Sequence, residues 1–211
     1  MTEPGLRERK KLRTHRAISE AAINLFLSFG FDKVSVAQIA DAAEVSKRTL
    51  FKYFPTKEDL VLDRFIDHID EYAAVVGARS PEQSPLAALH AWVLAGLADR
   101  TPTTGLSDHP SVLTFYRLVL DTPSLSSRLR DYTLRGVDAL TEALRVAKPA
   151  EDELTARIAA TQVVAVLQAL AESNWRTLLN GTSAEAHYPT AKRATERAFA
   201  LLENGIAEQY G

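Results

Sequence analysis

The chain has 211 residues and a formal net charge of −2, and 46% of its residues are hydrophobic, so it can bury a large core in one domain or in a small domain and a larger one. It contains no cysteine, which excludes disulfides, thiolate metal sites and cysteine nucleophiles. No apolar run approaches the roughly 18 residues that span a bilayer, and the N-terminus lacks the apolar segment of a signal peptide. We therefore expect a soluble, cytoplasmic protein.

The small net charge conceals an uneven distribution along the chain. Residues 1–57 contain 11 Lys and Arg against 6 Asp and Glu, a net charge of +5. Residues 58–211 contain 14 against 21, a net charge of −7. A basic end on an acidic body is expected when one end meets phosphate and the other does not.

The first elements follow from composition and spacing. Residues 1–11 are expected to form a flexible basic arm, which is either a solubilising tail or a DNA contact. A helix follows to about Phe29. Its apolar stripe consists of Ile18, Ala21, Ala22, Leu25, Phe26 and Phe29.

Residues 34–57 predict two short helices joined by a tight turn. The segment Ser35–Gln38 has the residue types and spacing of a capping box, so the first helix begins at about Val36. Ser46 is placed to cap the second helix, Lys47–Phe54.

Pro55 ends this second helix, because the residue before a proline avoids the helical region. Thr56 and Asp59 then cap the helix that follows. Such a segment is either an ordinary helical hairpin with a solvated basic face or a helix-turn-helix that inserts its second helix into the major groove of DNA. The charge distribution favours the second interpretation.

The remaining sequence also predicts helices. Lys57–Val76 should be one long helix, and the Pro- and Ser-containing segment Gly77–Ser84 should be a boundary. Leu86–Ala98 follows, capped by Ser84 and apolar except at His90, and a helix that is apolar all round is a buried one. We therefore expect it in the middle of the C-terminal domain.

Residues 101–111 predict a loop or a broken helix, and a helix that restarts at Pro123 should run to about residue 147. Two further helices are expected over about residues 151–179 and 189–209. No strand pattern is present. The predicted fold is all-α, with an N-terminal three-helix, homeodomain-like helix-turn-helix domain and a larger C-terminal helical domain for ligand binding and dimerisation.

The segment from about Leu12 to Asp70 resembles the DNA-binding domain of the tetracycline-repressor (TetR) family of bacterial transcriptional regulators. The residues that carry this resemblance are Ala21-Ala22, Leu25-Phe26, Gly30-Phe31, Ser35-Val36, Ile39-Ala40, Ala43, Val45-Ser46, Thr49-Leu50-Phe51, Tyr53-Phe54 and Lys57-Glu58-Asp59-Leu60. The implied domains are the arm, residues 1–11; the DNA-binding domain, residues 12–76, with its helix-turn-helix at about 35–54; and an effector-binding and dimerisation domain, residues 77–211.

Three positions depart from the family pattern. Glu44 stands in the turn where the family usually has glycine, so its backbone is expected in a less favourable conformation. Arg48 stands where glycine is frequent and adds a possible DNA contact. Phe51 stands where tyrosine is frequent and lacks a hydroxyl that relatives can use on phosphate.

The expected DNA contacts follow from position on the second helix. Its N-terminal side chains should approach base edges; these are Lys47, Arg48 and Thr49. Phosphates should be held by Lys52, Tyr53, Lys57 and Ser35, the last with the backbone N–H groups that follow it.

The last two helices carry broad apolar stripes, which form either an intramolecular core or a subunit interface. The resemblance implies a homodimer through a four-helix bundle, and two-fold symmetry suits a pseudo-palindromic operator. The candidate interface residues are Val163, Val166, Leu167, Leu170, Ala194, Ala198, Leu201 and Leu202.

The resemblance also implies an unknown small-molecule effector in the C-terminal domain. Bulky rings with a few polar groups are typical of ligand pockets, although an aromatic residue on a helical stripe is also an ordinary core residue. The candidates are His90, Trp92, Phe115, Tyr116, Tyr132, Gln168 and Trp175.

Other functional classes find no support in motifs. The five histidines lack metal-ligand spacing, and no nucleophile or phosphate-loop motif is present, so we expect no catalytic residue, metal or cofactor. The alternatives to DNA binding are a non-catalytic helical interaction module that binds an acidic protein and, after it, an all-α enzyme without a recognisable motif. The favoured hypothesis is a dimeric repressor that a small molecule releases from a palindromic operator.

Overall fold

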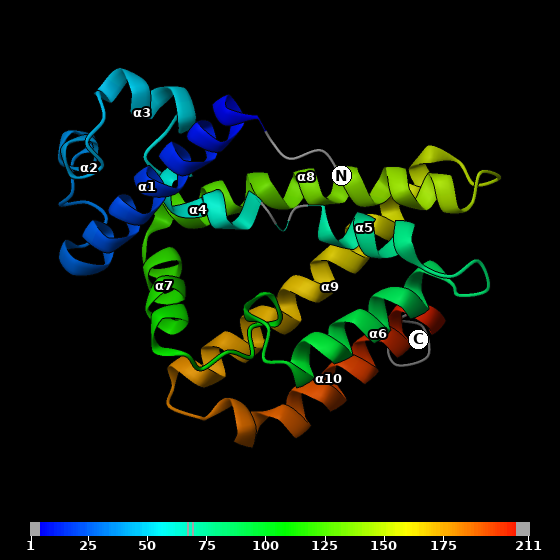
Figure 1. Ribbon diagram of the computed structural model, residues 1–211. Coiled ribbons are helices and arrows are strands. Elements are labelled where there is room, and N and C mark those ends of the chain that lie inside the picture. Colours follow the sequence, from blue (N-terminus) through cyan, green and yellow to red (C-terminus); the bar gives the residue numbers. More distant parts are fainter. Residues whose placement is uncertain (1–4, 67, 69, 206–211) are drawn as a thin grey trace. The chain divides into compact units, whose positions relative to one another are not determined.

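The computed structural model describes residues 5–66, 68 and 70–205, and within these ranges the chain is helical and contains no strand. This confirms the predicted all-α fold. In chain order the elements are α1 (Leu6–Phe29), α2 (Val36–Ala42), α3 (Lys47–Tyr53), α4 (Asp59–Ile66), α5 (Glu71–Ala78), α6 (Pro85–Ala98), the 3-10 turn η1 (Pro102–Thr104), α7 (Pro110–Asp121), α8 (Pro123–Ala147), α9 (Glu153–Leu179) and α10 (Ala184–Asn204) (Figure 1).

The chain divides into two compact units. Unit 1 comprises the chain up to Ile66 together with Leu118–Leu129, and unit 2 comprises the remainder. Two helices, α7 and α8, therefore contribute residues to both units. The predicted domains, residues 12–76 and 77–211, divide the chain by expected function. The two compact units divide it differently, since unit 1 ends at Ile66 and includes Leu118–Leu129.

Unit 1 is a small helical domain built around α1. Helix α1 contacts α2 and α4, and α2 contacts α3. Its core residues are almost fully buried; they include Ile18, Ala22, Phe26, Ile39, Leu50, Phe54, Leu60 and Leu125. The predicted apolar stripe of the first helix thus packs inward, except at Phe29, which is 61% exposed.

Two predicted elements of the N-terminal region need correction. Residues 6–11 belong to α1 rather than to a flexible arm, because Lys, Leu and Arg favour helix, and residues 1–4 lie outside the described residues. The predicted helix Lys57–Val76 is two helices, α4 and α5. Between them the Glu71 N–H bonds the His68 carbonyl at 3.3 Å, a turn in a stretch of Asp and His with low helix propensity.

Unit 2 is organised around α10, which contacts α6 and α9; α6 also contacts α5 and η1. Helix α6 buries Ala88, Leu89, Val93 and Leu97. Its alanines at 87, 91 and 95 are exposed, so the expectation of a helix buried all round is wrong. The small alanine side chain is common on exposed helix surfaces, so the hydrophobic composition of α6 did not show that this face is exposed.

Helix α10 begins at Ala184, five residues before the predicted start at Pro189. The Ser183 side chain caps it by accepting a hydrogen bond from the Ala186 N–H at 3.2 Å. Pro189 lies in the second turn, where it removes one intrahelical hydrogen bond, the one to the carbonyl four residues earlier.

By length and composition alone, α9 is long and apolar enough to cross a membrane, with a mean hydropathy of 1.5 over an 18-residue window. Polar residues such as Gln162 and Gln168 interrupt its apolar sequence, so it is not the unbroken apolar run whose absence the sequence indicated. The helix packs against α10 and η1 within unit 2, where it buries Val163, Leu167 and Ala171. The core helix of a soluble protein passes the same length and hydropathy test, so this feature is weak evidence for a membrane span.

Candidate functional site

The two short helices α2 and α3 have the predicted caps. Ser35 and Gln38 form a reciprocal capping box: the Gln38 N–H donates to Ser35 Oγ at 3.3 Å, and the Ser35 N–H donates to Gln38 Oε1 at 2.8 Å. Ser46 Oγ accepts from the Thr49 N–H at 3.0 Å. A cap satisfies backbone donors that a helix of seven residues cannot satisfy internally.

The turn between these helices has the strained backbone expected at Glu44, whose φ is +53°. The Glu44 N–H bonds the Asp41 carbonyl at 3.1 Å, and the Val45 N–H bonds the Ala40 carbonyl at 2.9 Å. This is the Schellman pattern, in which the left-handed position favours glycine. The chain therefore turns here at a conformational cost.

Helix α3 presents a basic outer face. Lys47, Arg48 and Lys52 are exposed, and Phe51 is 47% exposed. Thr49 is half-buried, and its hydroxyl lies 2.8 Å from Ser46 Oγ. The cationic side chains are thus presented to solvent by a helix whose start is fixed, while the Thr49 hydroxyl is engaged in the cap.

The Lys57 side chain is folded into unit 1. Its Nζ donates to the Phe31 carbonyl at 2.5 Å and lies 4.3 Å from the centre of the Phe31 ring. Burial lowers the pKa of Lys57, against the opposing effect of Asp32 and Glu58. The side chain is half-buried and the ammonium has three donors, so the phosphate contact expected from the sequence stays a prediction.

His15 joins three elements of unit 1, a role that the sequence analysis missed. Its Nε2 lies 3.1 Å from Asp63 Oδ1 on α4, and its ring stacks on Phe54 with centroids 4.7 Å apart. Half-buried Tyr53 at the end of α3 meets the same ring edge-on at 6.1 Å. Helix α1 thereby fixes the C-terminal end of α3.

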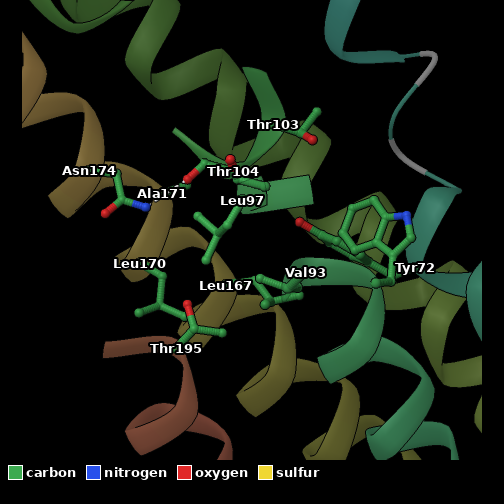
Figure 2. A pocket seen from close by; sticks show the side chains of 11 residues that line it. Tyr72, Val93, Leu97, Thr103, Thr104, Leu167, Leu170, Ala171, Asn174 and Thr195 are labelled. Carbon is green, nitrogen blue, oxygen red and sulfur yellow. Dashed lines mark hydrogen bonds between the residues drawn. The ribbon is translucent and has the colours of Figure 1, made fainter. Parts of the chain in front are cut away.

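Unit 2 contains a small cavity of about 20 Å³, room for about one water molecule. Figure 2 shows labelled side chains of α6, η1, α9 and α10 converging on it. It is lined by Tyr72, Trp92, Val93, Leu97, Thr103, Thr104, Leu167, Leu170, Ala171, Asn174 and Thr195.

Only Trp92 of the seven predicted pocket residues lines this cavity. Phe115, Tyr116 and Trp175 form an aromatic cluster instead, with Tyr116 stacked on Trp175 at 4.0 Å. His90 stacks on Phe199 at 4.4 Å. Buried Tyr132 lies under Arg135, and exposed Gln168 donates to the Thr133 hydroxyl.

The turn η1 separates the cavity from the aromatic cluster, since Thr103 and Thr104 line the cavity and the Tyr116 hydroxyl donates to the Pro102 carbonyl at 2.8 Å. Burial raises the pKa of Tyr116, so the phenol remains protonated as this donor. Asn174 Nδ2 donates to the Thr104 carbonyl at 2.9 Å. The turn is therefore bonded to both α7 and α9.

The candidate interface residues lie on α9 and α10 in several degrees of burial. Val163 and Leu167 are already buried within unit 2. Ala194 is exposed; the half-buried members of the set are Val166, Leu170, Ala198, Leu201 and Leu202. Sequence periodicity could not separate residues facing the core from residues at its edge.

Other kinds of site find no support in the described part of the chain. No group of three or more His, Asp or Glu side chains there is arranged to hold a metal ion.

The cavity residues outside the prediction, chiefly Tyr72, Thr103, Asn174 and Thr195, come from four separate segments. No local signal in the sequence marks them.

The sequence family described as "Bacterial regulatory proteins, tetR family" matches residues 18–63. The regulator TcmR of Streptomyces glaucescens is 41% identical over 87 residues, which are 41% of this chain and 38% of TcmR. RutR of Escherichia coli K12 is 36% identical over 89 residues, 42% of each chain. The matches thus span about two-fifths of these relatives' own length.

The fold extends the likeness over most of the chain. The solved structure of NalD, the secondary repressor of the MexAB-OprM multidrug efflux pump in Pseudomonas aeruginosa, has a TM-score of 0.56. The alignment covers 88% of this chain and 96% of NalD at 17% identity, a level that establishes fold alone. Residues 18–63 therefore match the tetR-family model, and the likeness to NalD shows that most of the chain has the same fold as that protein.

Proposed function

We propose that the protein is a cytoplasmic, ligand-responsive transcription regulator, a dimeric repressor that a small molecule releases from a pseudo-palindromic operator. The observation that carries this proposal is the outer face of α3, where Lys47, Arg48 and Lys52 project from a capped helix in a unit that matches the DNA-binding domain of the family. Such a helix suits the major groove.

In the proposed complex, the exposed side chains at the start of α3 read bases. Lys47 and Arg48 supply hydrogen-bond donors to guanine, and Thr49 supplies its methyl group, since its hydroxyl is bonded to Ser46. Lys52, Tyr53 and the N-terminus of α2 at Ser35 hold phosphates and set the docking angle. Lys57 joins them with the donors that its bond to the Phe31 carbonyl leaves over.

The dimer is proposed to form through α9 and α10, which contact each other in unit 2. Apolar side chains remain exposed on the outer face of α9: Leu154 is 66% and Ile158 49% exposed, and Ala165 and Ala169 lie on the same face. A second copy related by a two-fold axis would cover this face and close a four-helix bundle.

Coupling is proposed to run through the chain segment shared by the two units. A ligand in the cavity displaces η1, and Tyr116 passes the displacement to α7, whose end lies in unit 1 with the start of α8. The effector releases DNA only if it binds more tightly to the dimer conformation in which the two DNA-binding units fit the operator less well.

The experiment begins with selecting a binding site from random duplexes and measuring its affinity by fluorescence anisotropy. Arg48→Ala should cost about 1–3 kcal/mol and relax preference at one base pair, whereas Lys52→Ala should weaken all duplexes alike. Lys148→Ala, an exposed lysine of unit 2, is the matched control. No selection of any sequence, or equal losses for Arg48→Ala on selected and random DNA, would contradict the proposal.

The dimer is tested separately by sedimentation velocity at micromolar concentration. We expect one species with twice the mass of the chain, and Ile158→Glu should shift it toward the monomer, because a carboxylate on an apolar seam loses its hydration. The control is Ala87→Glu, on the exposed face of α6. A monomeric wild-type protein would refute this part of the proposal.

A further inference from the structure

We infer that Phe51 on α3 contacts the C5 methyl group of a thymine in the major groove, and that this contact makes one base pair of each half-site a determinant of sequence choice. The inference deepens the proposed function and rests on it. Its basis is an exposed aromatic ring on a helix face that is otherwise cationic.

The ring of Phe51 lies on the outer surface of α3. Phe51 is 47% exposed, whereas Leu50 and Phe54 on the same helix are fully buried. Residues three and four apart on a helix are neighbours on its surface, so Phe51 lies beside Lys47 and Arg48. These are the two side chains proposed to read bases, and the ring therefore lies where base edges are read.

The charges around Phe51 indicate which partner its ring meets. Lys47, Arg48 and Lys52 are exposed, and none of the three forms an ion pair with another described residue. A purely apolar partner would bury these cations without counter-ions. In the major groove, phosphates line both sides and the base edges lie between them. The ring of Phe51 therefore meets base edges when its cationic neighbours meet DNA.

The base edges offer Phe51 a single apolar group. Each base pair presents hydrogen-bond donors and acceptors in the major groove, and thymine alone adds a methyl group. A phenyl ring against a donor or acceptor removes its hydration without replacing the hydrogen bond, whereas a ring against the methyl group buries two apolar surfaces. Phe51 also has no hydroxyl with which to bond a phosphate. Its ring therefore favours thymine over cytosine at the pair it covers.

Thr49 is a second residue of α3 that offers an apolar group to the groove. It precedes Phe51 by two residues, which is about 200° around the helix, so the two residues cannot cover the same methyl group. The Thr49 hydroxyl lies 2.8 Å from Ser46 Oγ. Thr49→Ser deletes the methyl group and keeps this hydroxyl, which makes it a matched control for Phe51.

The test replaces thymine by deoxyuridine, which lacks the C5 methyl group and keeps every hydrogen-bonding atom of the base. The duplex selected by the wild-type protein is synthesised with this change at one position at a time, in both half-sites together, and its affinity is measured by fluorescence anisotropy. Burial of one methyl group is worth about fourfold in affinity. With one contact in each half-site, we expect at least one pair of positions where wild-type binding weakens about tenfold or more.

Variants then assign one such pair of positions to Phe51. At that pair, Phe51→Ala should bind the thymine and deoxyuridine duplexes equally, with an affinity near that of the wild type for the deoxyuridine duplex. Phe51→Leu keeps an apolar side chain and should retain part of the preference, which guards against a folding defect. Thr49→Ser should leave the preference there unchanged, as should Phe29→Ala, a phenylalanine of α1 that is 61% exposed.

Two results would overturn the inference: a selected duplex in which no thymine methyl group affects the affinity, or a methyl dependence that Phe51→Ala leaves intact at every position. Either result leaves the proposed function standing, because the protein has by then selected a DNA sequence. Failure to select any sequence would instead overturn the proposed function, and this inference with it.

Discussion

Arg128 and Asp59 connect the beginning of α8 to the beginning of α4 within unit 1. The Arg128 Nε lies 3.1 Å from Asp59 Oδ1, and the other carboxylate oxygen, Oδ2, accepts the Thr56 N–H at 3.0 Å. The Asp59 N–H in turn donates to Thr56 Oγ1 at 3.2 Å. One buried carboxylate therefore caps the helix that follows the recognition segment and also holds α8.

Arg128→Gln should lower the free energy of unfolding by about 1–2 kcal/mol. The variant removes the positive charge beside the buried Asp59 carboxylate, but Arg128 is itself 32% exposed, so the loss is smaller than the roughly 3–5 kcal/mol of a fully buried pair. Urea titration measures the change. Arg130→Gln, an exposed arginine of the same helix, is the control, and equal losses for both variants would show that the contact with Asp59 is unimportant.

Glu44→Gly should raise the free energy of unfolding by about 1 kcal/mol. Glycine removes the left-handed strain at φ +53°, and this gain exceeds the added entropy of the unfolded chain. Thermal and urea unfolding check the prediction. A loss of stability would mean that the exposed Glu44 side chain makes a stabilising interaction that outweighs the strain.

Arg100→Gly is the contrasting case, because Arg100 occupies an equivalent left-handed position after α6, at φ +56°. Its side chain bonds Leu97 and Glu185 and lies 4.6 Å above the ring of Tyr188. We expect a net loss of stability, since these contacts outweigh the relief of backbone strain. Stabilisation comparable to that of Glu44→Gly would contradict this.

Gly105→Ala should destabilise the protein by about 3 kcal/mol or more, and Gly181→Ala by only about 1 kcal/mol. Both glycines have positive φ, +76° and +96°, so both substitutions carry backbone strain. Only at Gly105 would the new Cβ meet atoms: the Ala171 carbonyl oxygen at 2.2 Å and Trp175 Nε1 at 2.8 Å. The difference between the two unfolding free energies isolates the close approach of the loop to α9.

Tyr116→Phe should cost about 1 kcal/mol and loosen η1 from α7. The substitution removes the hydrogen bond to the Pro102 carbonyl and retains the ring that stacks on Trp175. Hydrogen exchange should accelerate in residues 102–106 more than in α9. Tyr188→Phe is the control, and unchanged exchange around η1 would refute the proposed link between this turn and α7.

Local features could be predicted from the sequence because their causes lie within a few residues. The caps at Ser35, Ser46, Thr56 and Ser84 each join a side chain to a backbone N–H three residues away, and all four are present. The strain at Glu44 follows equally from one position in a turn. The match to the tetR-family model lies in the N-terminal segment, residues 18–63.

Features that depend on distant segments could not be predicted. The cavity combines α6, η1, α9 and α10 with Tyr72, and only a folded chain brings these together. Lys57 illustrates the same limit at a single residue: nothing near it in the sequence indicates the hydrogen bond from its ammonium to the Phe31 carbonyl, 26 residues earlier. Spacing along a helix says which side chains share a face and not what that face meets.

The membership of Leu118–Leu129 in unit 1 has a consequence for the construction of chimeric regulators. A fragment that ends at Ile66 would lack Val119, Leu125 and Arg128, which belong to the same compact unit. A chimera that transplants the reading head onto another relative must therefore carry this second segment or rebuild its contacts. A chimera joined at Ile66 without this segment would contain an incomplete unit 1 that lacks the start of α8.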